Sequence, residues 1–156
     1  MPWVCGYVRA VPPQASEQVG DKASSQLGHG GDDQVRLTLP ARPEYVRLAR
    51  ITASGLASRL GFSWDEIEDL RLAVDELCHA LLSPLPTDGT MRLRYAMADD
   101  AIEVFARLDQ GPGKAVRAPA IGDLSHQILS ALVDEHRLVD PESSLWIRKV
   151  RRDPAP

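Results

Sequence analysis

The sequence predicts an α+β domain in which helices cover one face of a single mixed sheet. Several short segments alternate apolar with polar residues, as half-buried strands do. Other segments repeat apolar residues at spacings of three and four, which is typical of helices with one buried face. The predicted order of elements is β-α-α-β-β-α-β, and it favours one sheet with the helices packed on one side.

The first strand and the first helix are indicated by residues 34–61. Apolar positions alternate from Val35 to Leu39, and Pro40 closes the strand. Pro43, followed by an acidic residue in the first turn, predicts the start of a helix, and Gly61 predicts its end.

The second helix has the clearest boundaries. Ser63 is predicted as the N-cap, and Glu66, three residues later, completes a capping box. One buried face follows, and Pro84 and Pro86 end the helix. The members of that face are Ile67, Leu70, Val74, Leu77, Cys78 and Leu81.

The remaining elements are a hairpin, a third helix and a last strand. Alternating residues at 91–97 and 102–108 surround a turn at Asp99-Asp100, which predicts a β-hairpin. Apolar spacing from Ile121 to Val133 predicts the third helix, which must pack on the sheet. Residues 145–150 form the last strand. Its cations indicate a solvated strand edge, and they are Arg148, Lys149, Arg151 and Arg152.

Chain length, charge and cysteine content exclude several classes of function for this protein. The 156 residues suggest one domain, and 18 Lys and Arg against 22 Asp and Glu give a net charge of −4. A chain this mildly acidic is a poor candidate for non-specific nucleic-acid binding, which needs a basic surface. Two cysteines are too few for a disulfide framework or a structural zinc site. Without an apolar run of about 20 residues or a secretory leader, we expect a cytoplasmic protein that does not contact membranes.

The folded domain is expected to span residues 34–152. Residues 1–33 are rich in Gly, Ser and Pro and poor in large apolar side chains, so we expect a disordered tail. A short C-terminal tail spans 153–156. One apolar patch in the N-terminal tail is either a greasy chain end or a docking peptide, and it comprises Trp3, Val4, Tyr7 and Val8.

Two segments are candidates for chemistry. On the second helix, Glu76 shares a face with Ala73 and Ala80, so its carboxylate either lines a pocket or belongs to a solvated charged face. At the end of a predicted strand, Asp109 precedes Gly111 and Gly113. That acid can accept a hydrogen bond from an exocyclic amine, and the glycines allow a close approach to a ligand, although an ordinary turn has the same pattern.

The histidines give weaker indications. Asp75 and His79, four residues apart, are more typical of a surface pair than of a catalytic dyad. His126 and His136 belong to no set of residues with metal-ligand spacing, so we predict no metal site built from protein side chains.

Taken in order, these features resemble the GHKL (histidine-kinase-like) ATPase superfamily, and within it the bacterial anti-sigma factor and serine-protein kinase family of RsbW-like proteins. The resemblance runs from about Val35 to Arg152, and its most specific segment is Ala73-Val74-Asp75-Glu76-Leu77-Cys78. It implies a two-layer α/β sandwich with a mainly antiparallel sheet and three helices on one face. It also implies a homodimer that binds a sigma factor and is released by an anti-anti-sigma factor.

The resemblance also assigns roles to single residues. It implies that Glu76 is the general base for phosphoryl transfer, and that Asp109 holds the adenine amine of ATP or ADP. Gly111 and Gly113 match the first nucleotide loop. On the first helix, Arg50 matches an arginine that contacts the sigma factor and its antagonist.

Three departures from the family pattern weaken the phosphate end of that site. Ala80 stands where the family has an asparagine that helps hold Mg²⁺, and alanine has no ligand oxygen. The lid between Gly113 and Ile121 is short, and the second loop keeps only Gly122, followed by an acid that repels phosphate. We therefore predict that ATP or ADP binds weakly and that Mg²⁺ is not firmly held. We also predict that the protein is an anti-sigma factor that acts by binding the sigma factor directly. An active ATP-dependent serine kinase is the alternative.

Overall fold

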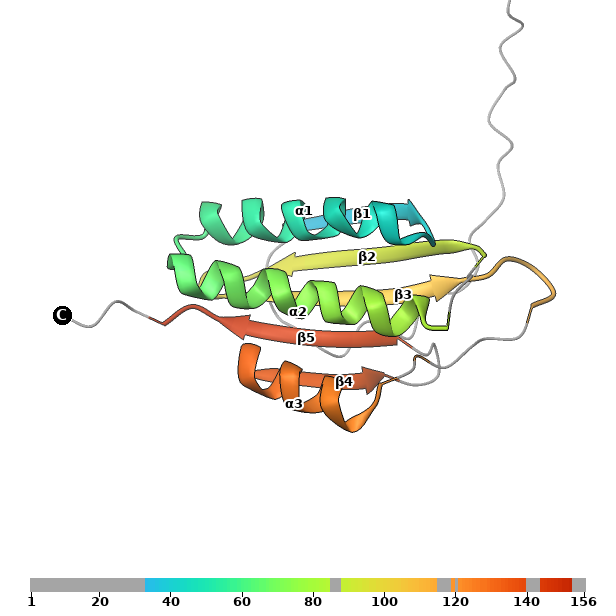
Figure 1. The fold of residues 1–156 in the computed structure, drawn as a ribbon. Coiled ribbons are helices and arrows are strands. Elements are labelled where there is room, and N and C mark those ends of the chain that lie inside the picture. The colour runs from blue at the N-terminus through green and yellow to red at the C-terminus, as the bar shows by residue number, and fades with distance from the viewer. Residues whose placement is uncertain (1–32, 85–87, 115–118, 120, 140–143, 153–156) are drawn as a thin grey trace, which may run out of the picture.

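The computed structural model describes residues 33–84, 88–114, 119, 121–139 and 144–152. It is a two-layer sandwich, with the helices on one face of a sheet (Figure 1). The strands are β1 (Gln34–Pro40), β2 (Thr90–Met97), β3 (Ala101–Asp109), β4 (Glu135–Val139) and β5 (Ser144–Val150). The helices are the 3-10 turn η1 (Pro43–Tyr45), α1 (Val46–Arg59), α2 (Trp64–Leu82) and α3 (Asp123–Leu132). The patch at Trp3–Val8 and the C-terminal tail lie outside the described residues.

The five strands form one sheet in the order β1-β2-β3-β5-β4. The predicted fold class is confirmed, but two details differ. Each pairing in the described sheet is antiparallel, rather than mixed. The strand β4 was not predicted, because its polar sequence Glu-His-Arg-Leu-Val does not alternate regularly between apolar and polar residues.

Because β4 occupies the edge, β5 is an interior strand, and the prediction of a solvated edge was wrong. Lys149 is only 4% exposed. Its Nζ donates to Asp69 Oδ2 on α2 and to the carbonyl of Leu132 at the end of α3, both at 2.8 Å. Arg151 Nη1 donates to the carbonyl of Leu60 at 2.7 Å. These cations connect the sheet to the helical layer.

The predicted start of α2 is confirmed, and the structure adds a tertiary contact to it. Glu66 Oε2 accepts hydrogen bonds from the Ser63 backbone N–H at 2.7 Å and from its hydroxyl at 2.8 Å. Glu66 Oε1 accepts from the backbone N–H of Arg152 at 2.7 Å. Burial raises the pKa of Glu66, but the hydrogen bonds from Arg152 and Ser63 outweigh burial, and the net pKa is lowered.

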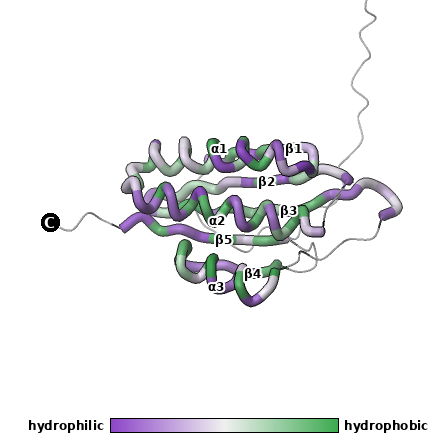
Figure 2. Tube along the Cα trace, viewed as in Figure 1, coloured by the Kyte–Doolittle hydropathy of each residue, from purple (hydrophilic) through white to green (hydrophobic). Residues whose placement is uncertain are grey.

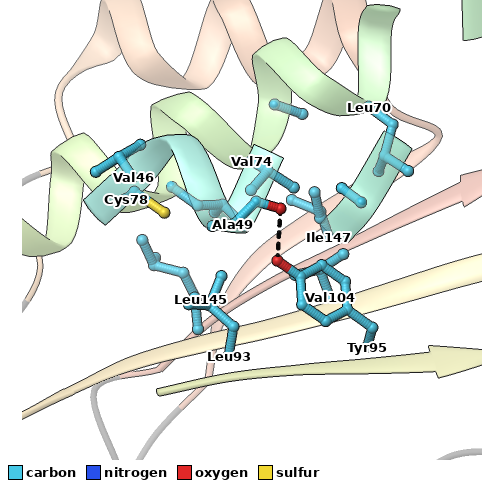
Figure 3. Packing of buried hydrophobic residues seen from close by; sticks show 14 of the residues in the cluster. Val46, Ala49, Leu70, Val74, Cys78, Leu93, Tyr95, Val104, Leu145 and Ile147 are labelled. Atoms are coloured by element: carbon cyan, nitrogen blue, oxygen red, sulfur yellow. Dashed lines mark hydrogen bonds between the residues drawn. The ribbon is translucent and has the colours of Figure 1, made fainter. Parts of the chain in front are cut away.

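The core lies between the helices and the sheet (Figure 3). Its centre is Tyr95 on β2, whose hydroxyl donates to the carbonyl of Ala49 on α1 at 2.9 Å. Small residues of α1, among them Ala49 and Ala53, let the helix approach the sheet closely enough for this bond. Hydrophobic and hydrophilic positions alternate along α1 and α2 (Figure 2). Among the described residues, no helix is long and apolar enough to cross a bilayer.

Candidate functional site

Three segments with candidate residues lie at one end of the sandwich (Figure 1). They are the C-terminal half of α2, the end of β3 and the N-terminus of α3. Glu76, Asp109 and Gly122 stand on these three segments, one on each. The fold therefore brings to one end candidates that lie up to 46 residues apart in the sequence.

Glu76 stands on the part of α2 that faces this end. Ala73 and Ala80, on the same helix face, are buried, while the glutamate itself is half-buried. Among the described residues, Glu76 has neither a hydrogen bond nor an ion pair. A half-buried carboxylate without an internal partner fits the pocket-lining interpretation better than the solvated-face one.

The carboxylate of Asp109, in contrast, has partners at both oxygens. Oδ1 accepts from the backbone N–H of Gly111 at 3.0 Å, and Oδ2 lies 3.0 Å from Arg92 Nη2 on the neighbouring strand. The side chain remains 40% exposed. An adenine amine would have to share these oxygens with Arg92 and Gly111.

The glycines after Asp109 are required by backbone conformation. Gly111 and Gly113 have φ of +87° and +82°, which side chains rarely adopt. No atom of the described residues lies within 4 Å of where a Cβ at either glycine would be. The loop therefore leaves open space at the positions that the resemblance assigns to the first nucleotide loop.

Sequence reasoning missed one residue that positions Asp109. Gly89 has φ of +116°, and a Cβ there would lie 2.3 Å from the backbone oxygen of Asp109. Only glycine permits this approach between the start of β2 and the end of β3. An Asp-Gly dipeptide such as Asp88-Gly89 is typical of a turn, but the contact of Gly89 with Asp109 depends on strand register.

At the N-terminus of α3, Gly122 is the N-cap residue and no side chain caps the helix. Its carbonyl accepts from the backbone N–H of His126 at 3.1 Å. Asp123 follows in the first turn. The Asp123 carboxylate interacts favourably with the positive end of the helix dipole. It also repels a phosphate group at this end of the helix.

Arg50 lies on α1 and forms an ion pair across to α2. Its Nη1 is 3.2 Å from Asp75 Oδ1, and Asp75 Oδ2 is 3.4 Å from His79 Nδ1. The Arg50 side chain is 39% exposed. The predicted Asp75–His79 surface pair is confirmed, and the structure adds the arginine to it.

The structure also joins two histidines that sequence reasoning left apart. His126 Nδ1 on α3 lies 3.2 Å from His136 Nε2 on β4. Burial and the neighbouring His126 lower the pKa of His136. In the described residues, no group of three metal-ligating side chains occurs.

Comparison with known proteins identifies the family. The chain is 34% identical to the serine-protein kinase RsbW of Bacillus subtilis over 125 residues, which is 68% of this chain and 78% of that protein. It is 44% identical to a serine-protein kinase RsbW of Listeria monocytogenes over 126 residues, with 68% and 79% coverage. The chain belongs to the RsbW family. No family model matches the chain.

A solved structure supports the fold of this RsbW-family chain. The structure of the RsbU and RsbW domains of a Mycobacterium tuberculosis protein superimposes with a TM-score of 0.56 at 18% identity. The match covers 77% of this chain and 32% of that longer chain. This match confirms the predicted sandwich, and the relatives above confirm the resemblance to the RsbW family.

ATP with Mg²⁺ is a plausible ligand for an RsbW-family protein, and the residues present fit it in part. The adenine end keeps Asp109 and a loop with open space at its glycines. The phosphate end fits poorly, because Ala80 is only 5% exposed and carries no oxygen, and Asp123 adds negative charge. The roles of these residues toward a nucleotide remain predictions.

Proposed function

We propose that this RsbW-family chain is an anti-sigma factor that sequesters a sigma factor by direct binding and is released by an anti-anti-sigma factor. The observation that carries this proposal is Ala80, a buried alanine at the position where the resemblance implies the Mg²⁺-holding asparagine. It favours binding over catalysis. We propose further that the protein is cytoplasmic, that it acts as a homodimer, and that Arg50 contacts the partners.

Nucleotide binding is proposed to be weak. Loss of the Mg²⁺ ligand and of the second glycine loop removes several charge-assisted contacts, each worth about 1.5–3 kcal/mol. A loss of about 4 kcal/mol weakens affinity roughly a thousand-fold. Titration with ATP, with and without Mg²⁺, tests this, and micromolar Mg²⁺-dependent binding would contradict it.

The second candidate function is an active serine kinase that phosphorylates its antagonist. It is favoured by the relatives, which are named serine-protein kinases, and by Glu76, whose carboxylate has no partner among the described residues. A general base needs such a carboxylate within reach of the substrate hydroxyl.

In vitro transcription with sigma factor, antagonist and ATP separates the two functions. Glu76→Gln keeps the shape of the side chain and removes its charge. A protein that acts by binding alone should repress and release equally well with either residue. If ATP-dependent release requires Glu76, the kinase function replaces the binding one. Asp65→Asn, the corresponding change at an exposed acid at the other end of α2, is the matched control.

A further inference from the structure

Two histidines, His126 on α3 and His136 on β4, face each other across the gap between helix and sheet, and they are here called the histidine pair. Their separation of ten residues in the sequence fits no common metal-binding motif. Only the packing of α3 beside β4 makes them neighbours (Figure 1). Because His136 stands opposite the buried Ile147 of β5, its ring lies on the helical side of the sheet.

The spacing of the two rings matches that of two ligands on one metal ion. Nδ1 of His126 lies 3.2 Å from Nε2 of His136, and the ring planes are tilted by 42°. Two imidazole nitrogens bound to one tetrahedral Zn²⁺ at about 2.0–2.1 Å lie about 3.3–3.4 Å apart. The observed distance is within about 0.2 Å of this value, a deviation that a metal site tolerates. Since His126 is exposed, a small rotation of its ring closes the difference.

The chemistry of the pair also suits a metal ion. When both rings are neutral, one of the two facing nitrogens donates a hydrogen bond and the other accepts it. When an ion binds, the donor ring moves its proton to its far nitrogen, so that both facing nitrogens present a lone pair. The pair then provides two neutral imidazole ligands without losing a proton.

Nearby charges favour a cation at this place. The helix α3 contains neither Lys nor Arg, and Asp123 stands one turn before His126. On β4 the cation is Arg137, which lies on the opposite face of the sheet and stacks on an aromatic ring there. Lys149 of β5 lies on the helical side, but its ammonium is paired with Asp69 at 2.8 Å. No uncompensated positive charge among the described residues therefore opposes an ion at the histidine pair.

We propose that the histidine pair binds a divalent transition-metal ion of the Zn²⁺ class and that this ion joins α3 to β4. The two ring nitrogens supply two of the four positions of a tetrahedral ion, and water occupies the others. In the described part of the chain, no group of three metal-ligating side chains occurs. The site is thus an exchangeable one and differs from a closed structural zinc centre. It lies away from Arg50 and does not depend on the proposed sigma binding.

A bound ion changes how the first half of α3 is held. Among the described residues, the bond within the histidine pair is the only hydrogen bond or ion pair that joins residues 121–128 to another helix or strand. Metal–ligand bonds at this place fasten the first turn of α3 to the edge strand β4. That turn begins after Gly122, at the end of the sandwich where the other candidate residues lie.

The test uses the full, untagged chain, freed of metal with EDTA, and Zn²⁺ as the probe in calorimetric titration at neutral pH. The wild type should bind one Zn²⁺ per chain. His126→Gln and His136→Gln keep a polar side chain that can form hydrogen bonds but lose the imidazole. Each should weaken Zn²⁺ binding by at least about ten-fold, since the loss of an outer-shell partner alone costs about 10–100-fold.

The matched control is His79→Gln, the same change at an exposed histidine of α2 that pairs with Asp75. It should retain the affinity of the wild type for Zn²⁺. A wild type that does not bind Zn²⁺ would overturn the proposal and leave the pair as a hydrogen bond alone. Binding that persists in both pair variants, or that all three variants weaken equally, would place the ion elsewhere and overturn it as well.

NMR of the imidazole nitrogens identifies the ligand atoms. Zn²⁺ should shift Nδ1 of His126 and Nε2 of His136 and leave the ring of His79 unchanged. Mg²⁺ should shift none of them, because this hard cation prefers oxygen ligands. Amide hydrogen exchange in the first turn of α3 should slow with Zn²⁺ in the wild type and not in His126→Gln. Mg²⁺ as effective as Zn²⁺ would contradict the assigned ligands, and exchange that Zn²⁺ does not slow would contradict the joining of α3 to β4.

Discussion

The two ends of α2 differ in how their charged side chains are used. At the N-terminal end, Glu66 accepts three hydrogen bonds, one of them from Arg152 after β5, and Asp69 receives the buried ammonium of Lys149. At the C-terminal end, Glu76 has no partner among the described residues, and Asp75 forms exposed pairs. The first end holds the sheet to the helices, and the second leaves its carboxylates available to a ligand or partner.

This difference teaches that a glutamate's role in this chain follows from its local cap and from its tertiary contacts together. Glu66 and Glu76 stand on the same helix, Glu66 in its first turn and Glu76 in its C-terminal half. The Ser63 cap and the return of the chain at the end of β5 distinguish Glu66 from Glu76. The following predictions test the contrast, in order of decreasing effect.

The largest effect is expected from Asp69→Ala. It leaves the Lys149 ammonium, which is 4% exposed, with only the carbonyl of Leu132 as partner. Removing one partner of a fully buried pair costs about 3–5 kcal/mol, and because Asp69 is 38% exposed we expect about 2–3 kcal/mol. Urea unfolding measures it. Asp75→Ala, the matched change at the other end of α2, should cost below about 1 kcal/mol. Equal losses would remove the contrast between the two ends.

The second prediction compares two identical substitutions. Glu66→Gln loses charge-assisted hydrogen bonds and should lower the free energy of unfolding by about 2 kcal/mol. Glu76→Gln loses none and should stay within about 0.5 kcal/mol of the wild type. Chemical denaturation of both variants, at equal protein concentration, gives the comparison. A stability loss in Glu76→Gln as large as in Glu66→Gln would show that Glu76 is structural.

The sequence predicted most of the N-terminal end of α2. Ser63 and Glu66 form a local pattern, because a capping box needs only residues three apart. The bond from Arg152 could not be predicted, since it joins positions 86 residues apart. For the same reason the last strand was placed at an edge. The position of β5 in the sheet depends on its pairing with β4, and the polar sequence of β4 gives no sign of that pairing.

The sequence predicted which residues belong to the candidate site, but not how their side chains are arranged and paired. Glu76 and Asp109 follow from local patterns and from the family resemblance. The ion pair between Arg92 and Asp109 follows from the register that pairs Thr90 with Asp109. The hairpin turn and the core packing together set the register, so it cannot be predicted from the sequence of one segment.

The third prediction concerns pH. The pKa of Glu66 is lowered in the folded protein, so the unfolded chain binds the proton more readily as the pH falls. The stabilisation by this carboxylate is present above its unfolded pKa of about 4.3 and is lost as the pH falls through the folded value. Glu66→Gln should therefore flatten the acid limb of the stability profile. Denaturant melts of the wild type and of Glu66→Gln, from neutral pH down to below about pH 4, measure this difference.

The smallest effect on stability is expected at Arg50, where function and folding should separate. Arg50 and Asp75 form a half-exposed pair at 3.2 Å, and such pairs contribute about 0–1 kcal/mol. Arg50→Ala should thus leave the melting temperature nearly unchanged while it weakens binding to the cognate sigma factor, as measured by calorimetry. Asp75→Asn is the matched control, because it releases the guanidinium without removing it and should retain binding. If both variants lose binding equally, the ion pair positions the helices, and Arg50 is not itself the contact. If Arg50→Ala unfolds the domain and binding per folded molecule is intact, the C-terminal end of α2 is as structural as its N-terminal end.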